Sequence, residues 1–124
     1  MRISLLIAAG LATLLAAAHS YLGERYILMR LFRRTDLPKL FGGAEFTRRT
    51  LRFAWHITSI AWLGLASLIL VLARSPGEAQ VTQARLIAGV FGISGLAALV
   101  GSRGRHLSWV VFLVIAALVW FGYP

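Results

Sequence analysis

The chain has 124 residues, of which 59% are hydrophobic, and its mean hydropathy is +0.78. A soluble domain has about 45–50% apolar residues, so this composition favours an integral membrane protein and leaves little length for a soluble domain. The formal net charge is +9 and there are no cysteines, which excludes disulfides, thiolate metal sites and cysteine nucleophiles. Because the basic residues flank apolar runs, we predict membrane lipids as partners and no nucleic-acid partner.

Four runs of the chain contain no Asp, Glu, Lys or Arg: residues 3–23, 53–73, 86–102 and 106–124. A helix that crosses a bilayer needs about 20 apolar residues, with about 17 as the lower limit. The sequence therefore predicts an all-α fold, an integral membrane bundle of four transmembrane helices in a single domain, 1–124. We place the helices at about 3–34, 45–73, 81–101 and 106–121.

The start of the chain is similar to a secretory signal, because Arg2 precedes an apolar stretch that ends in alanines at 16–18. Cleavage there would export the most basic segment of the chain, against the preference of basic loops for the cytoplasm. We therefore expect the first apolar run to be retained as a helix.

The arginines predict the topology. The segment between the first two apolar runs contains three acidic residues and eight basic ones: Arg25, Arg30, Arg33, Arg34, Lys39, Arg48, Arg49 and Arg52. The third connection lies on the same side and adds Arg103 and Arg105, whereas the opposite side has only Arg2, Arg74 and Arg85. The richer side is expected to be cytoplasmic, so both termini are predicted to be non-cytoplasmic. Short loops and a single lysine are typical of a bacterial inner membrane protein.

The first connection is predicted to be a basic amphipathic cytoplasmic loop. Asp36 can cap a short helix that has Pro38 in its first turn and ends at Gly42. A second amphipathic stretch, residues 45–52, leads into the second long helix. The residues expected to contact lipid headgroups are Arg30, Arg33, Arg34, Lys39 and Arg48.

The three histidines, His19, His56 and His106, all fall near the predicted cytoplasmic ends of helices. Ionisable residues within membrane helices usually face the bundle interior, which makes them candidates for a site. The spacing of four between Arg52 and His56 places these two side chains on one helix face, and His19 lies five residues before Glu24 on the first helix. The candidate polar site comprises His19, Glu24 and His56, gated by Arg25, Arg49 and Arg52.

The function favoured by these features is a non-enzymatic protein that binds anionic lipid headgroups or a membrane partner at the cytoplasmic face. Small residues recur every four positions on the first and third helices, as Ala8, Ala12, Ala16 and as Ala84, Ala88, Gly92. Such stripes let helices approach closely, either within the bundle or in a homo-oligomer. The alternative is a haem or metal protein that uses His19 and His56 as ligands.

A further alternative is a membrane enzyme. The topology resembles that of the membrane-associated glutathione-metabolising family, and the segment Arg48–His56 resembles the basic motif in that family's second helix. The resemblance implies a lipophilic substrate and an anionic cosubstrate. The family motif continues to an Asn and a Glu, where this chain has Thr58 and Ile60 or Ala61, so the polar groups that hold glutathione are absent.

The length and the four predicted spans also resemble small multidrug-resistance transporters. Those proteins carry an acidic residue deep in the first helix, whereas residues 3–18 of this chain have none. We therefore do not predict transport.

Overall fold

The computed structural model describes residues 2–74, 77 and 80–123, and within these residues every regular element is helical. The first rod consists of α1 (Ile3–Leu22), the π-helix η1 (Gly23–Leu28) and the single turn α2 (Met29–Leu31). The other helices are α3 (Glu45–Arg74), α4 (Val81–Gly101) and α5 (Ser108–Gly122). The predicted all-α class is confirmed.

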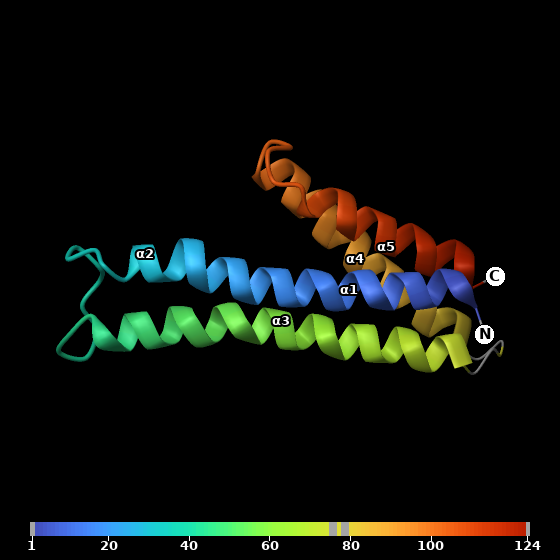
Figure 1. Cartoon of the computed structure of the whole chain (residues 1–124), viewed down its shortest axis with the longest axis horizontal. Helices are drawn as coiled ribbons and strands as arrows, with labels where there is room; N and C mark the ends of the chain where they lie inside the picture. The colour runs from blue at the N-terminus through green and yellow to red at the C-terminus, as the bar shows by residue number, and fades with distance from the viewer. Residues whose placement is uncertain (1, 75–76, 78–79, 124) are drawn as a thin grey trace.

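The helices form two antiparallel pairs. The first rod and α3 are long and lie side by side, while α4 and α5 form a shorter hairpin beside the half of the rod that contains the N-terminus (Figure 1). α1 packs against both α3 and α5, whereas α3 and α4 touch only slightly. Both termini lie at one end of the molecule, and the connection between α2 and α3 lies at the other (Figure 1).

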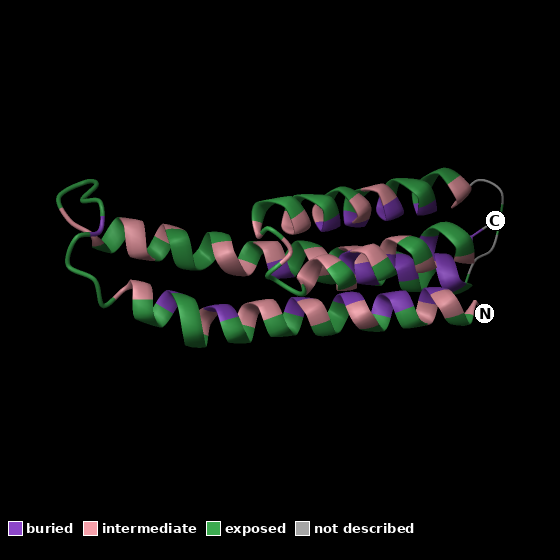
Figure 2. Ribbon diagram, turned by 90° about the horizontal axis from the view of Figure 1, so that it is seen from above, coloured by how far each residue is buried: buried purple, intermediate pink, exposed green. Residues whose placement is uncertain are grey.

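The core lies in the half of the molecule where the two pairs meet, as the buried residues in Figure 2 show. Its largest fully buried side chains come from all four helices: Leu5, Ile69, Phe91, Ile115 and Val119. The alanine stripe of α1 is also buried. Small residues here let α3 and α5 approach α1 closely.

Within the described residues, three helices are long and apolar enough to cross a membrane: Ile3–Leu31, Glu45–Arg74 and Val81–Gly101. The fourth, α5, has 15 residues, which is about 22 Å at 1.5 Å per residue and less than a typical hydrocarbon core. It begins at Ser108 rather than at His106, because Arg103 and Gly104 adopt positive φ angles of 51° and 76° in the preceding turn.

The first connection differs from the prediction. The first rod ends at Leu31, because Arg33 and Arg34 donate their backbone N–H groups three residues back instead of four. No helix follows Pro38; instead Leu40 and Gly43 form an isolated antiparallel bridge around Phe41 and Gly42, which both have positive φ. α3 then begins at Glu45.

Asp36 does not cap a helix but forms an ion pair with Arg34. Arg34 donates from Nε and Nη2 to the two carboxylate oxygens at 2.8 and 2.5 Å. This hydrogen-bonded pair lowers the pKa of Asp36 from 3.8 to about 2. Since the folded pKa is the lower one, the stabilisation by this pair is present above about pH 4 and is lost as the pH falls through about 2.

We expect Arg34→Gln to raise the pKa of Asp36 towards its ordinary value of 3.8, because it removes both donors. The measurement is an NMR titration of the Asp36 carboxyl carbon in detergent micelles. Arg33→Gln, which removes an adjacent charge without either hydrogen bond, is the control and should leave the midpoint close to that of the wild type. An unchanged midpoint in Arg34→Gln would show that the pair does not form.

Candidate functional site

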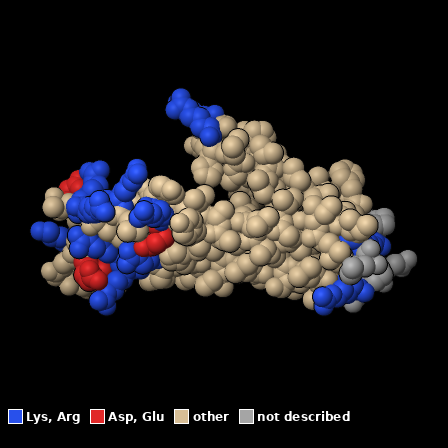
Figure 3. Space-filling view, in the orientation of Figure 1, with Lys and Arg blue, Asp and Glu red and all other residues tan. Residues whose placement is uncertain are grey.

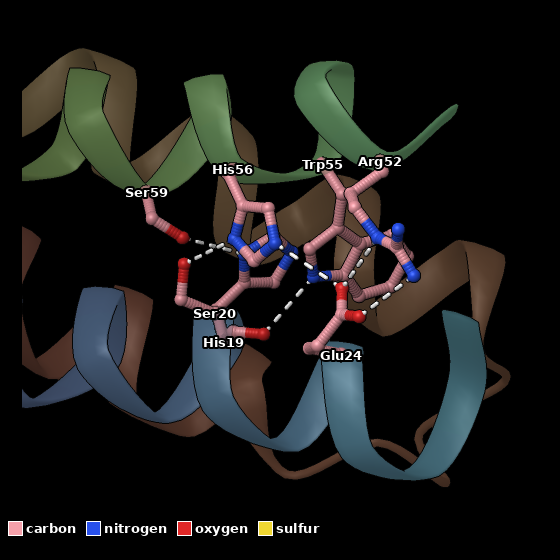
Figure 4. Close-up of polar contacts among 7 residues, drawn as sticks. All are labelled: His19, Ser20, Glu24, Arg52, Trp55, His56 and Ser59. Atoms are coloured by element: carbon pink, nitrogen blue, oxygen red, sulfur yellow. Dashed lines mark hydrogen bonds and ion pairs between the residues drawn. The ribbon is translucent and has the colours of Figure 1, made fainter. Parts of the chain in front are cut away.

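Polar side chains meet between the first rod and α3, at the border of the apolar core (Figure 4). The first rod contributes His19, Ser20 and Glu24, and α3 contributes Arg52, Trp55, His56 and Ser59. Spacings of three and four residues, such as Ser20 to Glu24 and Arg52 to His56, bring these side chains to the side of each helix that faces the other. We call these seven residues the polar cluster.

His56 connects the two helices through both of its ring nitrogens. Nδ1 is hydrogen-bonded to Ser20 Oγ at 2.7 Å, and Nε2 lies 3.3 Å from Glu24 Oε2. An ionised carboxylate only accepts hydrogen bonds, so Nε2 is the donor to Glu24. Glu24 also forms an ion pair with Arg52, whose Nη2 lies 3.0 Å from Oε1 and whose Nε lies 3.3 Å from Oε2. Glu24 therefore packs against His56 and Arg52.

His19 has different partners. Its Nδ1 is hydrogen-bonded to Ser59 Oγ at 2.9 Å, and its ring stacks on Trp55 with centroids 4.6 Å apart and planes 1° from parallel. Trp62 meets the same ring edge-on at 4.8 Å. Trp55 Nε1 donates to the backbone carbonyl of His19 at 3.0 Å. Ser59 is buried, with 4% of its surface exposed, and this bond satisfies its hydroxyl.

The π-helix makes room for Trp55. Gly23 opens the π-helix, and a Cβ atom on this residue would collide with the Trp55 indole ring. π-bulges widen a helix locally and often occur at functional sites. Here the glycine brings the backbone of the rod against the indole, so that Trp55 can stack on His19 and reach its carbonyl.

The cluster becomes more polar and more exposed along the helix axes. Ser59 is 4% exposed, the side chains of Glu24 and His56 are 31% and 34% exposed, and Arg52 is 50% exposed. Arg52 also lies over the ring of Phe32. The cluster therefore joins the apolar core to the charged end of the molecule.

Most of the basic residues gather at that charged end (Figure 3). Each acidic residue of this segment forms an ion pair with one arginine: Glu24 with Arg52, Asp36 with Arg34, and Glu45 with Arg49. These pairs use three of the eight basic residues. The other five form no ion pair with any carboxylate of the described chain: Arg25, Arg30, Arg33, Lys39 and Arg48.

The structure brings four of the six predicted site residues together: His19, Glu24, Arg52 and His56. Arg49 instead pairs with Glu45 on the surface of α3. Arg25 lines a separate hollow of about 220 Å³ on the first rod, which it shares with Tyr26, Met29, Arg30 and Arg33. His106 lies in the turn before α5 and is hydrogen-bonded to Ser108 at 2.8 Å.

The predicted site omitted Ser20, Gly23, Trp55 and Ser59. Their spacing indicated part of this arrangement. Ser20 lies four residues before Glu24, and Ser59 lies four residues after Trp55, so each pair shares a helix face. No sequence pattern indicated the close approach of Gly23 to Trp55, because this contact depends on how two distant segments pack.

The histidines are already engaged in hydrogen bonds. His56 uses both ring nitrogens and His19 uses Nδ1, so ligation of haem or a metal by His56 would require it to release Ser20 or Glu24. Within residues 2–74, 77 and 80–123, no group of three or more His, Cys, Asp or Glu side chains is placed to hold a metal ion. Cofactor binding stays a prediction, tested by an absorbance spectrum and metal analysis of the purified protein and its His19→Ala and His56→Ala variants.

No protein-family model, curated protein or solved structure matches this chain.

Proposed function

We propose that this chain is a four-span membrane protein that binds anionic phospholipid headgroups at the cytoplasmic face through its basic end. The observation that carries the proposal is the excess of positive charge at this end. Each of the three carboxylates is paired with an arginine, and five basic residues have no described carboxylate partner. Each Lys or Arg near an anionic membrane surface contributes about 1 kcal/mol of attraction. Five such residues favour an anionic surface over a neutral one.

The helix lengths support a position in the headgroup region. α4 has 21 residues, about 31 Å, which matches a hydrocarbon core of about 30 Å. The rod Ile3–Leu31 and α3 have 29 and 30 residues, so each exceeds the core by about 10 Å or more. With the short hairpin centred in the bilayer, the far ends of the long pair reach the headgroups and the cytoplasm.

In this arrangement α5 is the fourth span. Residues 106–124 carry no Asp, Glu, Lys or Arg, and local thinning of the bilayer accommodates a short helix at modest cost. Both termini lie at the end opposite the basic loop (Figure 1). This agrees with non-cytoplasmic termini if the basic end is cytoplasmic, as the positive-inside bias predicts.

Spin-labelled lipids test the proposal. The protein is reconstituted in phosphatidylcholine vesicles with a trace of labelled phosphatidylglycerol or labelled phosphatidylcholine, and electron paramagnetic resonance gives the fraction of each label that the protein immobilises. We expect a preference for phosphatidylglycerol that weakens as salt is added, because salt screens exposed charges. Equal immobilisation of the two labels would contradict the proposal.

A matched pair of variants locates the preference. R30Q/R33Q neutralises two arginines of the basic end, and R74Q/R85Q neutralises two at the opposite end. We expect the first variant to lose a larger part of the preference for phosphatidylglycerol than the second. Equal losses would show that the preference does not come from the basic end.

A further inference from the structure

The surface of α3 contains a groove that starts among charged residues beside the interface with the first rod and continues among apolar ones. Its volume is about 430 Å³, and it is lined by Arg49, Arg52, Phe53, His56, Ile57 and Ile60. We call these six residues the α3 groove. From Arg49 to Ile60 the groove follows the helix for 11 residues, about 16 Å.

No other part of the described chain covers the apolar half of this groove. Phe53, Ile57 and Ile60 are 55%, 53% and 65% exposed. In the proposed orientation these exposed side chains meet lipid, with Ile60 deepest and Arg49 nearest the headgroups. The polarity of the groove thus changes in the same direction as that of a phospholipid.

The charged half of the groove retains hydrogen-bond donors. A guanidinium has five N–H donors. Arg49 donates to Glu45 from Nε, and Arg52 donates to Glu24 from Nε and Nη2. The remaining N–H groups of both arginines are available to a phosphate, for which the planar guanidinium is well suited. Arg48, adjacent to Arg49, adds a positive charge that no described carboxylate pairs.

We propose that the α3 groove holds one anionic phospholipid molecule, with its phosphate at Arg49 and Arg52 and one acyl chain along Phe53, Ile57 and Ile60. This inference rests on the proposed function and assigns it a specific site. A soluble anion would contact only the charged half, and a zwitterionic phospholipid would bring a cationic group beside Arg48, Arg49 and Arg52. A phospholipid with an anionic headgroup matches both halves.

Photocrosslinking tests the site. Phosphatidylglycerol with a diazirine in its acyl chain is incorporated into nanodiscs that contain the full chain, and mass spectrometry maps the labelled residues after irradiation. We expect label concentrated at residues 53–60, and less label there from a phosphatidylcholine probe with the same diazirine. Label spread evenly over the lipid-facing surfaces of all helices, or equal labelling of residues 53–60 by both probes, would overturn the inference.

Two variants and a control sharpen the result. Arg49→Gln removes an exposed donor and should lower labelling at residues 53–60 about fivefold. This is the change in affinity that corresponds to the attraction of one cation to an anionic surface. Ile57→Trp should lower it by filling the groove, and both positions are exposed enough to leave the fold intact. Arg33→Gln, on the separate hollow of the first rod, should not reduce groove labelling. Loss in Arg33→Gln but not in Arg49→Gln would overturn the inference.

The outcome for the groove is separable from the outcome for the proposed function. If spin-labelled phosphatidylglycerol is preferred while the crosslinks avoid residues 53–60, the basic end binds anionic lipid but the groove does not. If neither measurement distinguishes phosphatidylglycerol from phosphatidylcholine, both proposals fail. Displacement of the groove label by soluble glycerol 3-phosphate would also overturn the inference, because it would show that the site recognises the headgroup alone.

Discussion

Gly23→Ala is expected to lower the free energy of unfolding by about 1–3 kcal/mol, the usual cost of forcing extra volume into a packed site. A Cβ atom at this position would collide with the Trp55 indole, which is stacked on His19 and hydrogen-bonded to its carbonyl. The indole is rigid and held from two sides, so it cannot simply rotate away. Either Trp55 moves off His19 or α3 moves away from the rod.

Gly10→Ala is the matched control, since it makes the same change in the same rod. Nothing lies within 4 Å of a Cβ atom at Gly10, and replacing an interior helical glycine by alanine stabilises by about 0.5–1 kcal/mol. The measurement is reversible unfolding by SDS in mixed micelles, followed by circular dichroism. The two variants should shift the transition in opposite directions. Equal shifts would show that Gly23 is not in close contact with Trp55.

The long helices were predictable because absence of charge is a local property of the sequence. Runs of about 20 uncharged residues predicted the helical class, and three of the helices reach spanning length. The short length of α5 could not be predicted from the sequence in the same way. The run 106–124 is uncharged, but the turn with positive φ at Arg103 and Gly104 delays the helix to Ser108. A charge count does not detect a turn of this kind.

The polar cluster was predictable only in part, since the predicted site lacked Ser20, Trp55 and Ser59 and did not give the pairing. Intramembrane ionisable residues indicated His19, Glu24 and His56 as candidates. Which of them meet depends on the rotation of the rod relative to α3, and the π-helix at Gly23 changes that rotation locally. As a result Glu24 faces His56, and His19 faces Ser59. Spacing within one helix predicts a shared face, but it does not predict the partner across the interface.

Hydrogen bonds and an ion pair connect the polar cluster to the charged end. Glu24 accepts from Arg52 at the charged end and from His56 within the cluster. Arg52 also lines the α3 groove, together with His56. The same side chains that join the rod to α3 therefore position the charged half of the groove, and a change in the cluster should alter the proposed lipid binding as well as stability.

His56→Ala is expected to lower the free energy of unfolding by about 1–3 kcal/mol, the range for leaving a polar partner without its hydrogen bond. The change removes the hydrogen bonds of the His56 ring to Ser20 and Glu24, which join α3 to the first rod. Ser20 loses a partner at 2.7 Å, and Glu24 retains only Arg52. Ser20 and Glu24 are only partly exposed, so leaving them without this partner carries a cost.

His106→Ala is the control for this prediction, because His106 is exposed and its hydrogen bonds are confined to the turn before α5. It should change the SDS unfolding transition by less than about 0.5 kcal/mol, as surface substitutions usually do. His56→Gln is a second comparison, since an amide can donate to Glu24 or accept from Ser20 and should recover part of the loss. If His56→Ala unfolds at the same SDS fraction as His106→Ala, the bonds between the rod and α3 through His56 contribute no stability. The link between the cluster and the groove would then have no energetic basis.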